Sequence, residues 1–262
     1  MLFFPVFLSG ELFRPGQLER GVVPLIAFCI ASSSTYLIND IHDRERDIGH
    51  PRKRHRPIAS GEVSVPAALA VAIVLLSGSI AISLKISIIF SLYIVGYLTV
   101  SFLYTYWLKN VPIFDIFCIS TGFLIRLLAG GVIFAIPVTD WLFLSVFLLA
   151  VFLSTGKRLS EKLTLGSGAD DHRRTLGLYP NGFLEGVMFM TGGAVLVTYT
   201  LYVITQRALV YTVPLCCLGL MRFIFRVKAG EGGDPTESLL KDVPLLLVSL
   251  AWAGIIGWRL YF

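Results

Sequence analysis

Residues 18–47 read LERGVVPLIAFCIASSSTYLINDIHDRERD, an apolar run that ends abruptly in a dense charged cluster. The apolar part, residues 18–38, is long enough to cross the hydrocarbon core of a bilayer as a helix. The cluster that follows, residues 39–47, contains four acids and two arginines. This arrangement indicates a membrane protein with a concentration of carboxylates at the membrane surface.

Four polar residues of this cluster lie on one side of the predicted helix. Asn39, Asp43 and Asp47 follow one another at intervals of four residues, and Asp40 leans toward the same side. Carboxylates arranged in this way repel one another unless a cation lies among them. Mg²⁺ commonly binds one or two carboxylates together with phosphate oxygens. We therefore predict a magnesium–diphosphate site formed by Asn39, Asp40, Asp43 and Asp47, with the three aspartates as catalytic residues.

The composition is that of an integral membrane protein. Of the 262 residues, 55% are hydrophobic and 15% are charged, and the mean hydropathy is +0.77. Soluble domains carry closer to about 25% charged residues. The apolar runs are continuous rather than alternating, which favours helices over strands. We count nine of them, at about 2–12, 18–38, 65–84, 87–107, 112–135, 139–156, 182–205, 208–226 and 241–261.

These segments predict an all-α membrane bundle of about nine transmembrane helices, formed by residues 1–262 as a single domain. The first segment is interrupted by polar residues within half a span, so we expect its helix to be short or truncated. Fifteen of the 22 lysines and arginines lie in the loops after the second, fourth, sixth and eighth segments, and five lie on the opposite side. Because basic loops face the cytoplasm, the acid cluster is expected on the cytoplasmic side. This topology accounts for the net charge of +5, so we expect no nucleic-acid partner.

Basic residues follow the acids within the same loop. Residues 50–61 read HPRKRHRPIASG and contain Lys53 and Arg56, and Arg46 lies within the acid cluster. A polyphosphate is well held between a metal and basic side chains, since arginine offers a two-pronged donor and lysine a point charge. We predict that Lys53 and Arg56 contact the diphosphate and that Arg46 also belongs to the substrate-binding site. The alternative is that they only anchor a cytoplasmic loop next to solvated acids.

A second cytoplasmic loop begins with another charged motif. Lys157, Arg158 and Glu161 lie within five residues, at a spacing that brings them to one side of a helix end. We predict that they bind substrate as the second wall of a polar chamber, with Tyr179 further along the loop as a hydrogen-bond partner. An ordinary ion pair at a helix end is the alternative.

For three other charged residues, the sequence pattern indicates a role less clearly. Arg126 lies inside an apolar segment, where a charge is costly and indicates function. We predict that Arg126 is either a ligand of a substrate anion or the partner of a buried acid. Asp115 begins the same segment and is equally consistent with a helix cap and with the site. Asp234 lies in the loop before the last apolar segment and is expected to be a cap or turn residue without a chemical role.

The spacing Asn39-Asp40-x-x-Asp43-x-x-x-Asp47 resembles the first aspartate motif of the UbiA superfamily of intramembrane prenyltransferases. Most members with aromatic acceptors carry a second Asp-x-x-x-Asp motif. Here the equivalent helix end offers Lys157, Arg158 and Glu161, and bases suit the direct binding of phosphate. Four stretches look like the branch that attaches phosphoribose to a polyprenyl phosphate: His50-Pro51-x-Lys53-x-x-Arg56-Pro57-Ile58-Ala59-Ser60-Gly61, Phe123-x-x-Arg126-x-x-Ala129-Gly130-Gly131, Gly156-Lys157-Arg158-x-x-Glu161 and Gly233-Asp234-Pro235-x-Glu237.

This resemblance implies a Mg²⁺-dependent transferase of a bacterial cell membrane. It would move 5-phosphoribose from phosphoribosyl diphosphate to a polyprenyl (decaprenyl-like) phosphate and release diphosphate, in the synthesis of cell-wall arabinan. One alternative is transfer of a prenyl group from prenyl diphosphate to an aromatic or quinone-precursor acceptor. Another is a transporter or lipid-binding protein without enzymatic activity. The sequence leaves open whether copies of the chain associate as a homo-oligomer.

Overall fold

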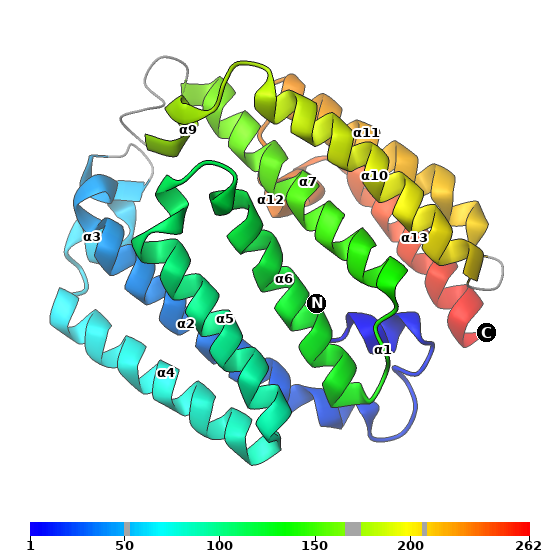
Figure 1. Ribbon diagram of the computed structural model, residues 1–262, viewed down its shortest axis with the longest axis horizontal. Coiled ribbons are helices and arrows are strands. Elements are labelled where there is room, and N and C mark those ends of the chain that lie inside the picture. Colours follow the sequence, from blue (N-terminus) through cyan, green and yellow to red (C-terminus); the bar gives the residue numbers. More distant parts are fainter. Residues whose placement is uncertain (50–52, 166–173, 206–208) are drawn as a thin grey trace.

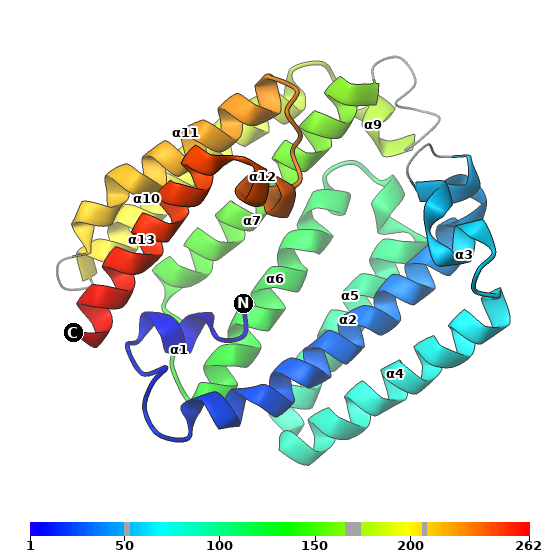
Figure 2. The same ribbon diagram turned by 180° about the vertical axis from the view of Figure 1, so that it is seen from behind.

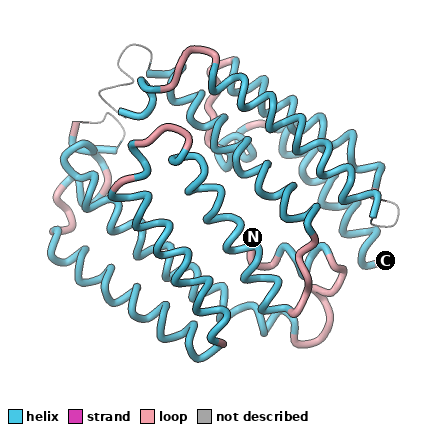
Figure 3. The backbone as a smooth tube through the Cα atoms, in the orientation of Figure 1, coloured by secondary structure: helices cyan, strands magenta, loops and turns pink. Residues whose placement is uncertain are grey.

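The computed structural model describes residues 1–49, 53–165, 174–205 and 209–262. Every regular element within these ranges is a helix, and Figure 3 shows no strand among them. Eight of the described helices are long and apolar enough to cross a membrane. They are α2 (Gln17–Ile48), α4 (Val65–Ile86), α5 (Ile88–Tyr106), α6 (Phe114–Phe134), α7 (Asp140–Leu165), α10 (Phe183–Thr205), α11 (Val213–Lys228) and α13 (Val243–Tyr261).

The prediction of an all-α membrane bundle is confirmed. Eight of the predicted apolar segments each overlap one of these long helices. The remaining segment, residues 2–12, forms only the helix α1 (Phe4–Leu8), in keeping with the short first helix that the sequence indicated. The other described short elements are η1 (Lys53–His55), α3 (Pro57–Ser60), η2 (Leu108–Asn110), α9 (Arg174–Leu178), η4 (Val210–Thr212) and α12 (Pro235–Lys241).

The long helices form two groups with a pair of helices between them. Helices α2, α4 and α5 lie on one side, α10, α11 and α13 lie on the other, and α6 and α7 run between the groups (Figure 1). The short helices α3 and α9 lie at one end of the bundle, whereas α1 and the C-terminus lie at the other (Figure 2). The two loops with predicted chemistry are therefore at the same end.

The interior between α2 and α5 is apolar and closely packed. Phe90 and Ile94 of α5 are fully buried against Ala27 and Ala31 of α2. The small alanines let the helices approach closely, as is common between membrane helices. Many large apolar side chains of the outer faces are instead exposed, as expected of surfaces that meet lipid.

Helices α2 and α7 continue well past their apolar segments. Helix α2 runs to Ile48, so the whole acid cluster is helical, and α7 runs to Leu165, so the second charged motif is helical too. Both motifs therefore lie on extended helix ends rather than on loops. This difference from the predicted boundaries matters, because side chains on a helix are held at fixed relative positions.

The loop before α12 packs directly on α7. A Cβ atom at Gly233 would lie 2.5 Å from Ser160 Cβ and 2.6 Å from the carbonyl oxygen of Gly156. Only glycine lets the two backbones approach this closely. The contact brings two motifs together that are more than seventy residues apart in the sequence.

Substitution of Gly233 by alanine tests this contact. The new methyl group would overlap the backbone of α7, so we expect a loss of about 1–3 kcal/mol in the free energy of unfolding. A thermal melt of the purified protein in detergent would show a lowered Tm. Gly186→Ala is the matched control, because no atom lies within 4 Å of a Cβ there. A Gly233→Ala melt as high as the control would contradict the close approach.

Candidate active site at the charged end of the bundle

Two of the acids of α2 share one basic partner. Arg56 Nη1 donates to Asp40 Oδ1 at 2.7 Å and to Asp47 Oδ2 at 2.9 Å. Lys53 Nζ lies 4.0 Å from Asp47 Oδ1. Lys53 is in η1 and Arg56 immediately precedes α3, whose first residue is Pro57. Lys53 and Arg56 thus lie against acids of α2 that precede them in the chain.

The other two polar residues of the cluster share a different base. Lys109 Nζ donates to Asp43 Oδ1 at 2.6 Å and lies 3.4 Å from Asn39 Oδ1. Lys109 is in η2 and is only 6% exposed. Burial lowers the pKa of Lys109, although the hydrogen bond with Asp43 opposes this shift. From the sequence, Lys109 was predicted only as one of the basic loop residues that set the topology, although its place in a short loop on the same side as the acids was the available clue.

The donor set fits a magnesium ion shared with a phosphate ligand. Asp40 and Asp47 direct one oxygen each at the same Arg56 nitrogen, so two carboxylates already converge on a cationic group. Mg²⁺ usually takes one or two carboxylates and completes its shell with water and phosphate oxygens. Within the described ranges, no three His, Cys, Asp or Glu side chains form a metal-binding group. The acids thus suit a metal that arrives with a phosphate better than a metal enclosed by protein.

Arg158 is the centre of a buried ion-pair network on the other side of the site. Its Nε donates to Asp115 Oδ2 at 2.8 Å and its Nη1 donates to Glu161 Oε2 at 2.9 Å. Arg158 is 2% exposed and Asp115 is fully buried. Tyr104 OH lies 3.5 Å from the remaining Nη2. The sequence was equally consistent with a helix cap and with a site residue at Asp115. In the structure, Asp115 is an ion-pair partner of Arg158 in the second motif.

Tyr179 completes this network. Its hydroxyl donates to Asp115 Oδ1 at 2.6 Å and accepts the backbone N–H of Ile113 at 2.6 Å. Burial, and then the hydrogen bond to the Asp115 carboxylate, raises the pKa of Tyr179, so the phenol remains a proton donor. Ile113 has φ +73°, which is unfavourable for a β-branched residue. The Tyr179 bond helps to hold this strained turn at the start of α6.

Lys157 has a different partner from its neighbour Arg158. Lys157 Nζ donates to Asp234 Oδ2 at 2.7 Å, and the two side chains are 43% and 38% exposed. Asp234 also caps α12 by accepting the backbone N–H groups of Thr236 and Glu237. Its predicted role as a cap is confirmed, but its ion pair was missed. The sequence does not show which distant helix the loop before α12 will meet.

The site thus contains two charged groups. The first is the acid cluster of α2 with Lys53, Arg56 and Lys109, and the second is Lys157, Arg158 and Glu161 with their partners Asp115, Tyr179 and Asp234. The two charged groups are linked through the loop between α5 and α6. Thr175 of α9, which is fully buried, donates its hydroxyl to the backbone carbonyl of Lys109 at 2.6 Å. Lys109 in turn holds Asp43 of the acid cluster. Helix α9, which leads to Tyr179, is therefore joined to the acid cluster by a continuous chain of hydrogen bonds. Arg46, the remaining predicted base, is exposed on α2.

Arg126 lies deeper in the bundle, on α6. Its Nη2 donates to Ser32 Oγ at 2.9 Å and to Tyr97 OH at 3.0 Å, and its Nη1 donates to the Gly122 carbonyl at 3.1 Å. The guanidinium also lies 4.4 Å from the centre of the Tyr97 ring. No carboxylate of the described residues forms an ion pair with it. Of the two predictions for Arg126, the buried acid partner thus finds no support in this part of the chain.

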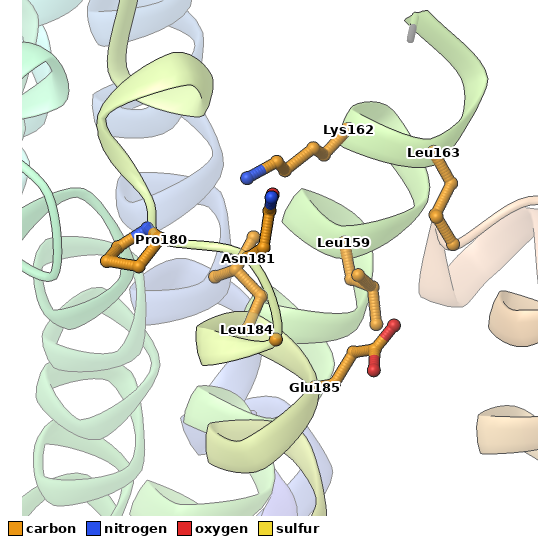
Figure 4. A pocket seen from close by; sticks show the side chains of 8 residues that line it. Leu159, Lys162, Leu163, Pro180, Asn181, Leu184 and Glu185 are labelled. Carbon is orange, nitrogen blue, oxygen red and sulfur yellow. The ribbon is translucent and has the colours of Figure 1, made fainter.

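A surface pocket of about 360 Å³ lies beside the second charged group, between the end of α7 and the start of α10 (Figure 4). Lys162 Nζ donates to the carbonyl oxygen of Tyr179 at 2.6 Å, and Figure 4 shows Lys162 and Asn181 among the side chains that line the pocket. Neither the acid cluster nor Lys157 and Arg158 line this pocket. It is therefore separate from the charged groups described above.

The fold and the site together define a polytopic membrane protein with an acid–base constellation at one end of a helical bundle. The UbiA prenyltransferase family model matches residues 3–251. The chain belongs to the UbiA prenyltransferase family, a family of transferases. The resemblance inferred from the motifs is thereby confirmed.

Individual relatives point to one branch of this family. The decaprenyl-phosphate phosphoribosyltransferase of Mycolicibacterium smegmatis is 35% identical over an alignment of 255 residues that covers 92% of this chain and 80% of that protein. The Corynebacterium glutamicum protein of the same name is 31% identical over 264 residues, covering 97% and 79%. A UbiA homologue from Archaeoglobus fulgidus, solved with GPP and Mg²⁺, has a TM-score of 0.77 at 19% identity and covers 99% of this chain and 94% of that one. This last likeness concerns the fold alone.

The buried network around Arg158 yields a stability prediction. Asp115→Asn removes the carboxylate charge and leaves the guanidinium buried beside a neutral amide. Glu161 still pairs with the guanidinium, so the loss should be about 3 kcal/mol, the lower end of the range for a broken buried pair, and the Tm in detergent should fall by several degrees. Glu185→Gln, which breaks the half-exposed pair with Lys228, is the control and should cost about 1 kcal/mol or less. Equal melts for the two variants would show that the buried pair does not stabilise the bundle.

Proposed function

We propose that this chain transfers 5-phosphoribose from phosphoribosyl diphosphate to a polyprenyl phosphate at the cytoplasmic face of a bacterial membrane. The observation that carries this proposal is the second motif. It presents a half-exposed lysine, Lys157, at the helix end where a second acidic motif would bind a prenyl diphosphate through metal. The shared name of the similar Mycolicibacterium and Corynebacterium proteins supports the same branch.

The first charged group would bind the diphosphate of the donor. Mg²⁺, when bound, neutralises the negative charge that develops on the departing diphosphate. Arg56 and Lys53 already lie against the acids, so each can exchange a carboxylate for a diphosphate oxygen with a small movement. Arg46 lies on the same helix and Lys109 holds Asp43 in place. The proposed metal ligands are Asn39, Asp40, Asp43 and Asp47.

The second charged group would bind the other phosphate. Lys157 is the basic residue of this group with substantial exposure, so we assign it to the ribose 5-phosphate or the acceptor phosphate. Arg158, Glu161 and Tyr179 make their described contacts within the protein and would fix the shape of this wall. Arg126 would serve as an additional anion ligand deeper in the bundle.

The proposed reaction needs little covalent chemistry from the protein. The bond between ribose C1 and the diphosphate oxygen breaks, and its electron pair leaves with the diphosphate. An oxygen of the acceptor phosphate forms the new bond to C1. The acceptor is already an anion, so no strong general base is required. Positioning of the two anions and electrostatic stabilisation would supply most of the rate.

A labelling experiment tests this function. Membranes that contain the protein, incubated with radiolabelled phosphoribosyl diphosphate and decaprenyl phosphate, should yield a labelled lipid and one diphosphate per lipid formed. Chelation of divalent metal should stop the reaction, and added Mg²⁺ should restore it. A prenylated aromatic product from prenyl diphosphate would support the alternative prenyltransferase. Binding of substrates without diphosphate release would point to a transporter or lipid-binding protein.

Asp43→Asn tests the acid cluster within the same assay. The loss of one proposed metal ligand should lower the transfer rate by at least about 100-fold, the size of effect seen when one electrostatic stabiliser is removed. Glu45→Gln is the matched control, because Glu45 belongs to the same run of acids but is exposed on the outer side of α2. Full activity of Asp43→Asn, or an equal loss in both variants, would refute the assigned role.

A further inference from the structure

Residues 231–242 form a strap that is fastened at both ends to one arginine of α11. Arg226 Nη1 lies 3.1 Å from Glu231 Oε2 at the start of the strap and 2.9 Å from Asp242 Oδ2 at its end. Its Nη2 also donates to the backbone carbonyl of Glu231 at 3.0 Å. Between these points the strap carries α12, which lies folded back against the bundle (Figure 2).

The far end of the strap is held by a second arginine as well. Arg222 Nε and Nη2 donate to the Asp242 carboxylate at distances of 2.7–3.1 Å. These hydrogen bonds hold the pKa of Asp242 well below its usual value, so this carboxylate stays ionised. Asp242 also caps α13 by accepting the N–H of Leu245 at 2.8 Å. The strap is therefore fixed in place whether or not its middle contacts a ligand.

The strap delivers one carboxylate to the second charged group. Gly233 packs on the backbone of α7, and the next residue, Asp234, forms the ion pair with Lys157. Burial opposes the ionisation of Asp234, but hydrogen bonds from Lys157 and from the first amides of α12 outweigh it and lower its pKa. Asp234 is thus an anion held 2.7 Å from the amine that the proposed function assigns to a phosphate.

We propose that Asp234 is a built-in anionic competitor of substrate phosphate for Lys157, and that Arg226 positions the strap that holds it. This inference rests on the proposed function, in which Lys157 binds a phosphate monoester. A carboxylate and a phosphate oxygen accept hydrogen bonds from an ammonium group in the same way. Because the pair is half exposed, its interaction is weak enough for a doubly charged phosphate to displace it.

The competition has a direct consequence for affinity. In the free protein, Asp234 neutralises Lys157 and keeps the long side chain in one place. When a phosphate arrives, it must displace the carboxylate and then bind next to its negative charge. Removal of that charge should therefore strengthen phosphate binding, whereas removal of a residue that only caps α12 should not. A residue that itself contacts the ligand would weaken binding when it is changed.

Asp234→Asn separates these cases, because asparagine caps a helix as well as aspartate does. The measurement is equilibrium binding of ribose 5-phosphate to the purified full chain in detergent at low salt. We expect the Kd to fall about two- to fivefold relative to the unsubstituted protein, the range set by half-exposed ion pairs. The gain should disappear when Lys157→Ala is combined with Asp234→Asn and compared with Lys157→Ala alone. Glu185→Gln, which removes an equal charge elsewhere on the cytoplasmic side, should leave the Kd unchanged.

An unchanged or increased Kd in Asp234→Asn would overturn the proposal, as would an equal gain in Glu185→Gln. The same preparations are assayed for transfer of labelled phosphoribose, which separates the two hypotheses. If the unsubstituted protein transfers phosphoribose and Asp234→Asn binds no more tightly, only the competition is wrong. If Asp234→Asn binds more tightly through Lys157 and no phosphoribose is transferred, only the proposed function is wrong.

Discussion

The packing at one end of the bundle depends on one buried guanidinium, that of Arg158, which requires carboxylate partners. Arg158 is 2% exposed, and an unpaired charge in such a place would cost several kcal/mol. Its partners come from different parts of the chain: Asp115 begins α6, and Glu161 lies one turn further along α7. Tyr179 adds its hydroxyl to the same Asp115 carboxylate. Satisfying one cation thereby joins the two central helices and Tyr179, the residue that follows α9.

Other charged side chains at this end of the bundle are also paired with opposite charges from other parts of the chain. Asp40 and Asp47 share Arg56, Asp43 pairs with Lys109, and Asp234 pairs with Lys157. Each pair joins a long helix to a short element or loop. Each of these pairs has at least one side chain that is more exposed than Arg158 and Asp115. Asp47 and Lys109 are themselves nearly buried, but their partners are not. A ligand that carries both metal and phosphate can replace such internal partners, because it offers each charge a new counterpart.

Much of this arrangement is readable from local pattern. The lengths of the apolar runs predict the long helices, and the four-residue spacing of Asn39, Asp43 and Asp47 predicts a shared helix side. The short first helix and the capping role of Asp234 were likewise predictable, since both depend on neighbouring residues. Other features were not. Lys109 was visible only as a loop charge, and the boundaries of α2 and α7 were set too early, because helices at a membrane surface continue into polar sequence when other elements pack on them.

The sequence by itself determined the class of this protein, its apolar membrane-spanning segments and the residue types of its two charged motifs, because hydrophobic length and helical spacing act over short distances along the chain. The tertiary structure alone decided the pairing. It placed Arg56 between two aspartates, set Asp115 against Arg158 and brought Asp234 to Lys157 across a contact that only Gly233 permits. Such pairings depend on which helices meet and how closely. That outcome is set by packing over the whole bundle and is not encoded in any local stretch.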